Sequence, residues 1–131
     1  MSSGPLVLIV EDNARNMTLV RDVLSFAGYR TMEASDGEQG VAVARAHRPD
    51  LILMDIQLPG IDGVEALAQL RADPSTSEIP VAALTAVAMK DDRERFLAAG
   101  FQGYIEKPLS VQELPVQVQA LIGAPPAGAS G

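Results

Sequence analysis

The stretch Leu51-Ile52-Leu53-Met54-Asp55 decides the fold of this 131-residue chain. Its first four residues form an unbroken apolar run, and an acid follows at once. A run of this kind, without alternation of apolar and polar residues, is typical of a parallel strand that is buried on both faces. We therefore predict an interior strand over Leu51–Met54, with Asp55 at its carboxyl end.

Four further runs rich in Val, Ile and Leu lie on either side of this strand, at intervals of roughly 20–30 residues. They span Leu6–Val10, Arg30–Ala34, Val81–Leu84 and Gly103–Glu106. The segments between them carry apolar residues three or four positions apart, which predicts helices. Examples are Met17, Val20, Val23 and Leu24, ahead of a stop at Gly28, and Val64, Leu67 and Leu70. The predicted order is a strand followed by a helix, repeated five times.

This alternation predicts an α/β fold, a doubly wound parallel sheet with helices on both faces. Five strands suit the flavodoxin-like order 2-1-3-4-5. We expect residues 1–5 to be a leader and residues 6–122 to form one domain. Residues 123–131 are Gly, Ala, Pro and Ser, too poor in large apolar side chains to pack, and are expected to be a flexible tail.

Composition narrows the classes of function. The chain has no cysteine, so any metal must be held by oxygen ligands. Its formal net charge of −7, without a basic cluster, argues against nucleic-acid binding. Apolar runs are too short to span a membrane, and no secretory leader opens the chain, so a cytoplasmic location is expected. Met1 lies close to the first strand, which favours a complete stand-alone protein.

Polar residues gather where the predicted strands end. In a doubly wound sheet, ligands bind outside the carboxyl ends of the strands, at the switch point between the first and third. Glu11 and Asp12 end the first strand, Asp55 the third, Thr85 the fourth and Lys107 the fifth. We therefore expect three carboxylates, one hydroxyl and one ammonium to converge.

Repulsion between two close carboxylates costs on the order of 4 kcal/mol at an effective dielectric of 20, so three acids at one edge call for a cation. Mg²⁺ fits, because it prefers carboxylate and water oxygens and leaves positions for a substrate phosphate. Phosphoryl transfer onto a carboxylate is the chemistry that such a site favours. Asp55 is the candidate nucleophile, Lys107 the charge that faces the acids, and Thr85 a donor for a phosphoryl oxygen.

Each residue also has a simpler interpretation. Asp12 or Asn13 could cap the first helix, and Thr85 could cap the helix after the fourth strand. Lys107 could be a solvated lysine at a strand end, and Tyr104 could pack in the last strand. The combination of residues favours the functional interpretation over each of these.

Four blocks in this order resemble the signature of receiver domains of two-component response regulators: Val10–Asn13, Met54–Gly60, Leu84–Ala86 and Glu106–Pro108. The resemblance covers roughly residues 6–122 and is nearest to stand-alone regulators of the DivK and CheY type and to receivers attached to hybrid histidine kinases. It implies that Asp55 accepts a phosphoryl group from a histidine kinase or a histidine phosphotransfer protein. The domain is then a signalling switch that acts only on its own phosphorylation.

The resemblance also implies roles for the other residues. Mg²⁺ would be held by Glu11, Asp12, Asp55 and the backbone carbonyl of Gln57. Lys107 would pair with phosphoryl oxygens, with a cis peptide to Pro108. Thr85 and Tyr104 would form a switch that alters a partner-binding surface running from the fourth helix to the fifth. Val87 has no polar group to orient an attacking water, which predicts a long-lived phosphoryl group.

Three rival functions and one variant of the preferred one are weighed against this. A phosphatase would commonly carry a second acid two residues after its nucleophile, but Gln57 occupies that position. In a flavin mononucleotide module the acids Glu11 and Asp12 would repel the phosphate. A purely structural adaptor would not need all five site residues. A receiver excised from a hybrid histidine kinase remains compatible with the sequence.

Overall fold

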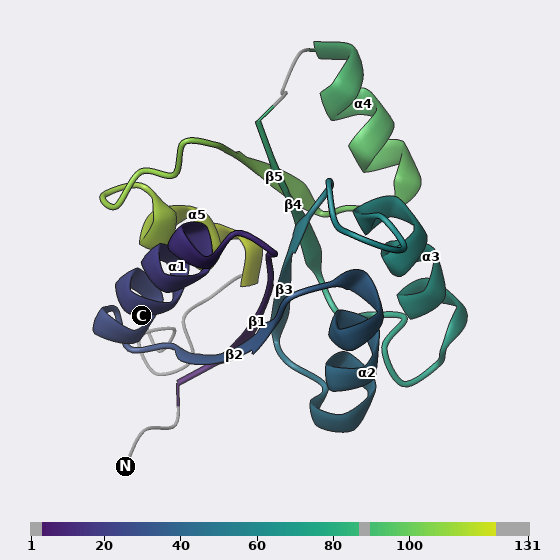
Figure 1. Cartoon of the computed structure of the whole chain (residues 1–131), viewed down its shortest axis with the longest axis horizontal. Helices are drawn as coiled ribbons and strands as arrows, with labels where there is room; N and C mark the ends of the chain where they lie inside the picture. The colour runs from purple at the N-terminus through teal and green to yellow at the C-terminus, as the bar shows by residue number, and fades with distance from the viewer. Residues whose placement is uncertain (1–3, 87–89, 123–131) are drawn as a thin grey trace.

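The computed structural model describes residues 4–86 and 90–122, which form a parallel five-stranded sheet between two layers of helices (Figure 1). The strands are β1 Leu6–Val10, β2 Arg30–Ala34, β3 Leu51–Asp55, β4 Val81–Thr85 and β5 Gly103–Glu106. The helices are α1 Ala14–Phe26, α2 Gly37–His47, α3 Gly63–Ala72, α4 Lys90–Ala99 and α5 Leu114–Ile122. The sheet order β2-β1-β3-β4-β5 confirms the predicted topology.

The buried apolar residues of the strands belong to two cores, one on each side of the sheet. On one side of the sheet, α1 and α5 cover side chains such as Ile9 and Leu53; on the other, α2, α3 and α4 cover side chains such as Val10 and Met54 (Figure 1). All residues of β3 are buried, as the unbroken apolar run predicts. Apolar burial on both faces stabilises the central strands, whose carboxyl ends carry the site.

Two details differ from the prediction. β3 and β4 are each one residue longer than expected, because Asp55 pairs with Leu84 and Thr85 pairs with Glu106 in the sheet. These polar residues therefore belong to the strands themselves. Val64, expected on the buried face of the third helix, is 40% exposed, and Ala66 is buried instead. Ala66 packs in the core on the α2, α3 and α4 side of the sheet.

Helix ends follow local chemistry. The α1 helix is followed by Gly28 with φ of 101°, a conformation that glycine adopts readily, which confirms the predicted stop. The α3 helix begins with a capping box, in which the Asp62 side chain accepts the N–H of Glu65 and the Glu65 side chain accepts that of Asp62. No helix in residues 4–86 or 90–122 is long and apolar enough to cross a membrane.

Arg71 of α3 links two loops by hydrogen bonds to their backbones. The guanidinium of Arg71 donates hydrogen bonds to the carbonyl oxygens of Ser77, Ile79 and Gly100, at 3.1, 2.8 and 3.0 Å. Burial lowers the pKa of Arg71 from its usual value. The contacts join the loop before β4 to the loop before β5, so Arg71 sets the spacing of these connections.

Candidate functional site

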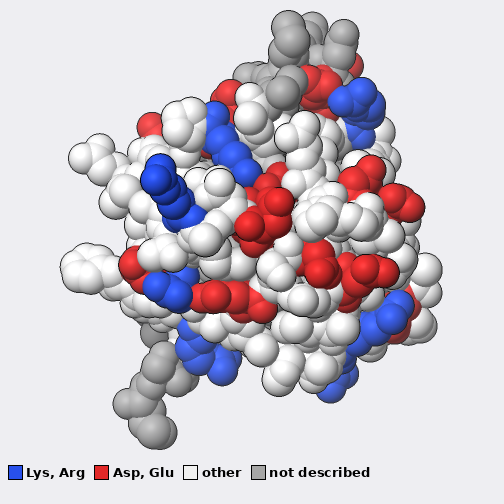
Figure 2. Space-filling view, in the orientation of Figure 1, with Lys and Arg blue, Asp and Glu red and all other residues white. Residues whose placement is uncertain are grey.

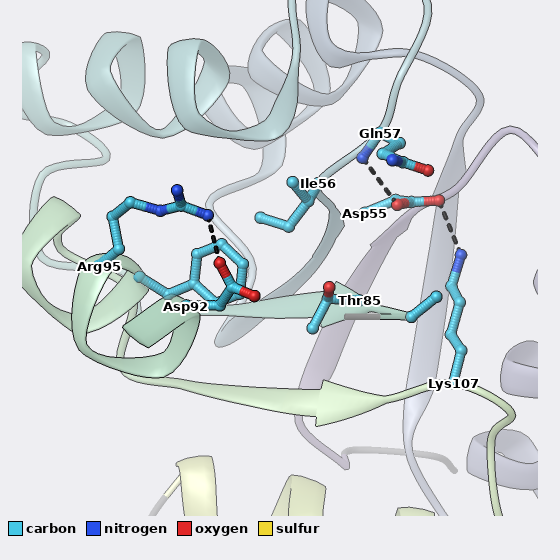
Figure 3. Close-up of a pocket in the computed structure, with 9 residues that line it drawn as sticks. Asp55, Ile56, Gln57, Thr85, Asp92, Arg95 and Lys107 are labelled. Carbon is cyan, nitrogen blue, oxygen red and sulfur yellow. Dashed lines mark hydrogen bonds and ion pairs between the residues drawn. The ribbon is translucent and has the colours of Figure 1, made fainter. Parts of the chain in front are cut away.

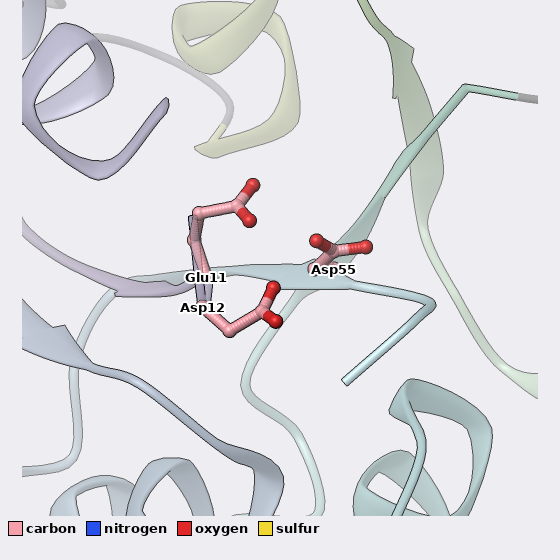
Figure 4. Close-up of side chains that lie close together, drawn as sticks. All are labelled: Glu11, Asp12 and Asp55. Atoms are coloured by element: carbon pink, nitrogen blue, oxygen red, sulfur yellow. The ribbon is translucent and has the colours of Figure 1, made fainter. Parts of the chain in front are cut away.

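Three carboxylates meet at the carboxyl ends of β1 and β3 (Figure 4). Glu11 and Asp12 directly follow β1, and Asp55 is the last residue of β3. Each offers a carboxylate oxygen, and these oxygens all lie within 4.8 Å of one another. Glu11 and Asp55 are buried, whereas Asp12 is exposed. The expected convergence of the three acids is therefore observed.

Asn13, and not Asp12, caps α1. The Asn13 side chain accepts the backbone N–H of Asn16 at 3.0 Å, while the backbone N–H of Asn13 donates to Oε2 of Glu11 at 3.0 Å. Because Asn13 satisfies the helix end, the carboxylate of Asp12 is left to the acidic group. The interpretation of Asp12 as a helix cap is wrong.

Lys107 follows β5 and lies against two of the acids. Its Nζ is 2.8 Å from Oδ2 of Asp55 and 2.8 Å from Oε1 of Glu11, and its side chain is 18% exposed. The contact with Asp55 is a hydrogen bond (Figure 3), and the contact with Glu11 is an ion pair without hydrogen-bond geometry. Lys107 is thus not a solvated lysine. Its peptide bond to Pro108 is cis, as the resemblance implies.

Burial and charge shift two pKa values in this group. Burial raises the pKa of Glu11 above its usual value and Asp55 adds to the rise, although Lys107 opposes it. Burial by itself lowers the pKa of Lys107, but the hydrogen bond to Asp55, the ion pair with Glu11 and the charges of both acids outweigh it, so its pKa lies above the usual value. With all four groups charged, the site holds an excess of two negative charges.

The donor set fits a divalent cation. Oε1 of Glu11 is buried, and although it forms an ion pair with Lys107 it has no hydrogen-bond partner among the described residues, so its coordination by a cation would cost no hydrogen bond. Carboxylates are the ligands that Mg²⁺ prefers, and its two charges match the local excess. Figure 2 shows acidic side chains gathered in the middle of the face in view, with a basic side chain beside them. The residues present therefore suit Mg²⁺.

Thr85 shares a cleft with Asp55 and Lys107. The cleft has a volume of about 240 Å³, and Asp92 and Arg95 of α4 line its far side (Figure 3). Thr85 is 6% exposed, at the end of β4. The described part of the next helix begins at Lys90, and residues 87–89 lie outside the described chain, so the interpretation of Thr85 as a helix cap stays a prediction. A phosphoryl group on Asp55 would enter the cleft that Thr85 lines.

Two expected residues lie apart from this cleft or outside the described chain. Tyr104, on β5, is partly buried against the core and lines a separate hollow of about 250 Å³ with residues of the loop between β5 and α5 and with Gln117 of α5. Its role in packing is confirmed, and its role in switching stays a prediction. Val87, on which the expected lifetime of the phosphoryl group depends, lies outside the described residues.

Sequence reasoning missed one residue that touches the backbone of Asp55. Gly63 begins α3, and its backbone N–H donates to the carbonyl oxygen of Ile56 at 3.0 Å. A side chain at Gly63 would collide with the carbonyl oxygen of Asp55. The capping pattern of Asp62 and Glu65 places Gly63 at the helix start and could have drawn attention to it.

Comparisons with known proteins agree with this geometry. The model of the response regulator receiver domain family matches residues 7–119. The polar-differentiation response regulator DivK of Brucella anthropi is 46% identical over 117 residues, which cover 89% of this chain and 95% of that protein.

Solved structures show the same fold. The receiver domain of the sensor histidine kinase PA1611 from Pseudomonas aeruginosa, crystallised with a magnesium ion in its active-site cleft, superposes with a TM-score of 0.84. It is 41% identical, and the match covers 92% of this chain and 99% of that one. The chemotaxis response regulator CheY4 of Vibrio cholerae gives a TM-score of 0.85 at 27% identity, over 89% of this chain and 98% of that one. This chain therefore belongs to the response regulator receiver domain family and is a signalling domain of a two-component system.

Proposed function

We propose that this chain is a single-domain response regulator in which Asp55 accepts a phosphoryl group from a phosphohistidine. The donor is a histidine kinase or a histidine phosphotransfer protein, the partners that membership of the family implies. The single observation that carries the proposal is the position of Lys107 Nζ, 2.8 Å from both Asp55 and Glu11, where β1, β3 and β5 end together. A partly buried ammonium between two carboxylates suits a site that binds a charged group such as a phosphoryl group.

Asp55 suits the role of nucleophile. Its carboxylate is 7% exposed, and its oxygens are oriented by the N–H of Gln57 at 2.9 Å and the ammonium of Lys107 at 2.8 Å. In the transfer, one carboxylate oxygen attacks the phosphorus, the P–N bond of the donor breaks, and the histidine nitrogen leaves with the bonding electrons. Lys107 is placed to stabilise the charge on the phosphoryl oxygens.

The acids around Asp55 supply the metal site of the proposal. Glu11, Asp12 and Asp55 would hold Mg²⁺ through carboxylate oxygens, together with the backbone carbonyl of Gln57. A bound Mg²⁺ neutralises charge on the phosphoryl oxygens during transfer. The carboxylates must be ionised to bind it, so protonation of Glu11 at low pH weakens the site.

The phosphorylated form acts through a protein surface. The phosphoryl group adds charge to the cleft that Thr85 lines, and Thr85 moves toward it while Tyr104 turns inward. These movements change the face from α4 across β5 to α5, on which a downstream protein partner docks. The donor phosphohistidine is formed from cytoplasmic ATP, so a cytoplasmic location is part of the proposal.

The test is incubation with acetyl phosphate and Mg²⁺ while the intact mass is measured. The native chain is expected to gain one phosphoryl group, and Asp55→Asn none. Asp62→Asn is the matched control, because it makes the same carboxylate-to-amide change in the loop after β3 and asparagine still caps α3. It is expected to behave like the native chain.

A gain of mass in Asp55→Asn equal to that of the native chain would defeat the assignment. If the native chain does not react with acetyl phosphate, a purified histidine kinase core carrying labelled phosphohistidine serves as the donor. Failure of transfer from that donor as well would sink the proposal. Turnover of small phosphomonoesters would favour the rival phosphatase.

A further inference from the structure

The loop between β3 and α3 closes back on the residue that carries the nucleophile. At its start, the N–H of Ile56 donates to the carbonyl oxygen of Leu84 at 3.1 Å, which holds the loop to β4. At its end, the N–H of Gly63 donates to the carbonyl oxygen of Ile56 at 3.0 Å. Between these points lies Gln57, whose N–H orients Oδ1 of Asp55.

Gly63 packs its α-carbon directly on the backbone of Asp55. A Cβ at this position would lie 2.5 Å from the carbonyl oxygen of Asp55 and 3.0 Å from the α-carbon of Ile56. The obstacle is backbone, so no side-chain rotation can relieve it. The φ of Gly63 is not positive. The position therefore requires glycine for space and not for its conformational freedom.

A second glycine supports the other side of the loop. A Cβ at Gly37, the first residue of α2, would lie 2.7 Å from Cγ1 and 2.9 Å from the carbonyl oxygen of Ile61. The contact between α2 and the loop therefore also depends on a missing side chain. The loop is held between α2 and the end of β3, with no spare room at either contact.

We infer that Gly63 is a positioning residue for phosphoryl transfer: its close contact with the Asp55 backbone sets the direction of the Asp55 carboxylate and the place of Gln57. The inference rests on the proposed function, because it gives these two residues their role at the metal and the phosphoryl group. An added methyl group must move α3 away from Asp55 by about 1 Å to reach ordinary van der Waals contact. Displacements of this size at a reacting group cost up to about 100-fold in rate.

The test compares Mg²⁺ affinity, measured by isothermal titration calorimetry well below the unfolding temperature, with the rate of phosphorylation by acetyl phosphate at saturating Mg²⁺. For Gly63→Ala the dissociation constant of Mg²⁺ is expected to rise about tenfold, as it does when other residues that orient metal ligands are mutated. The phosphorylation rate at saturating Mg²⁺ is expected to fall as well, because the nucleophile itself is misdirected.

Gly103→Ala is the matched control. Its added Cβ would also be crowded, 2.9 Å from Cδ2 of Leu121, but this neighbour is the end of a side chain on α5. Loss of stability with a Mg²⁺ dissociation constant within about twofold of the native value is expected. A general effect of a destabilised fold would move both variants alike, and that result would overturn the inference.

Gly37→Ala keeps the inference testable where Gly63→Ala does not fold. It displaces the same loop through Ile61, and it is expected to weaken Mg²⁺ binding less than Gly63→Ala and more than Gly103→Ala. Native Mg²⁺ affinity and rate in a folded Gly63→Ala, or in Gly37→Ala when the first variant is unfolded, overturn the inference. Absence of Mg²⁺ binding by the native chain would instead defeat the proposed function on which it rests.

Discussion

Replacing Lys107 by methionine should destabilise the metal-free protein strongly, and Mg²⁺ should restore much of the loss. Methionine keeps most of the apolar stem but removes the ammonium that lies 2.8 Å from Asp55 and 2.8 Å from Glu11. The change leaves two buried carboxylates, with Asp12 beside them, facing one another without a compensating charge.

The magnitude follows from these distances. At an effective dielectric of 20, each contact of 2.8 Å is worth about 6 kcal/mol of Coulomb attraction. The cost of burying the ammonium offsets much of this, as burial is the largest single influence on the pKa of Lys107. Removal of one partner from a buried pair costs about 3–5 kcal/mol. Because the Lys107 side chain is 18% exposed, we expect the lower end, about 3 kcal/mol.

The assay is urea unfolding followed by far-ultraviolet circular dichroism, with a chelator and then with saturating Mg²⁺. A cation between the acids replaces the missing positive charge, so Mg²⁺ should bind Lys107→Met more tightly than the native chain. An affinity about tenfold higher would recover about 1.4 kcal/mol of stability at saturation. The destabilisation should therefore fall to roughly half in Mg²⁺.

Arg21→Met is the control for Lys107→Met. Arg21 also contacts two carboxylates, Asp22 at 3.1 Å and Glu33 at 3.3 Å, but its side chain is 42% exposed. Solvent screens such pairs, so a much smaller loss than for Lys107→Met and no dependence on Mg²⁺ are expected. If Lys107→Met lost no more stability than Arg21→Met, or if Mg²⁺ stabilised it no more than the native chain, the electrostatic reasoning would be refuted.

Three further predictions concern the same fold. Glu11→Gln should stabilise the metal-free protein at pH 7, because the raised pKa of Glu11 means that its charged form opposes folding. This gain in stability should shrink as the pH falls through that pKa toward 4.5. Urea unfolding at several pH values measures it, and a gain that grows as the pH falls would contradict the prediction. Arg71→Met should cost about 2–3 kcal/mol, because three carbonyl oxygens lose a charged donor, and a loss below about 1 kcal/mol in urea unfolding would contradict the bracing role. Asp62→Ala should cost about 1 kcal/mol through the lost capping box, measured by the same method, with Mg²⁺ affinity preserved.

The acids of the site were predictable because the end of each apolar run marks the end of a strand. Asp55 follows an unbroken apolar run, and parallel strands bring their carboxyl ends to one edge, so the meeting of Asp55 with Glu11 and Asp12 follows from topology. The choice between Asp12 and Asn13 as the cap of α1 was not predictable, since both residue types cap helices well. Only the observed hydrogen bond from Asn16 to Asn13 decides it.

Gly63 and Val64 show where pattern reasoning ends. Helical periodicity placed Val64 on the buried face, but the way α3 rests on the sheet turns it outward and buries Ala66. Gly63 is the first residue of α3, and although the capping pattern marks this helix start, it does not indicate that the Asp55 carbonyl lies against it. Both facts depend on how closely two elements approach, and this distance is a property of the packed pair and not of either segment.

The sequence by itself determined the order of elements, the parallel sheet and the residue types at its carboxyl edge, because apolar periodicity and the handedness of crossovers are local properties that act along the whole chain. Only the tertiary structure decided that the Lys107 ammonium lies between Asp55 and Glu11, that an oxygen of Glu11 is left buried without a hydrogen-bond partner among the described residues, and that Gly63 touches the backbone of Asp55. Those contacts join residues far apart in the chain or across a folded loop, and their energies depend on burial and on distances of a few tenths of an ångström, which arise only when the layers pack.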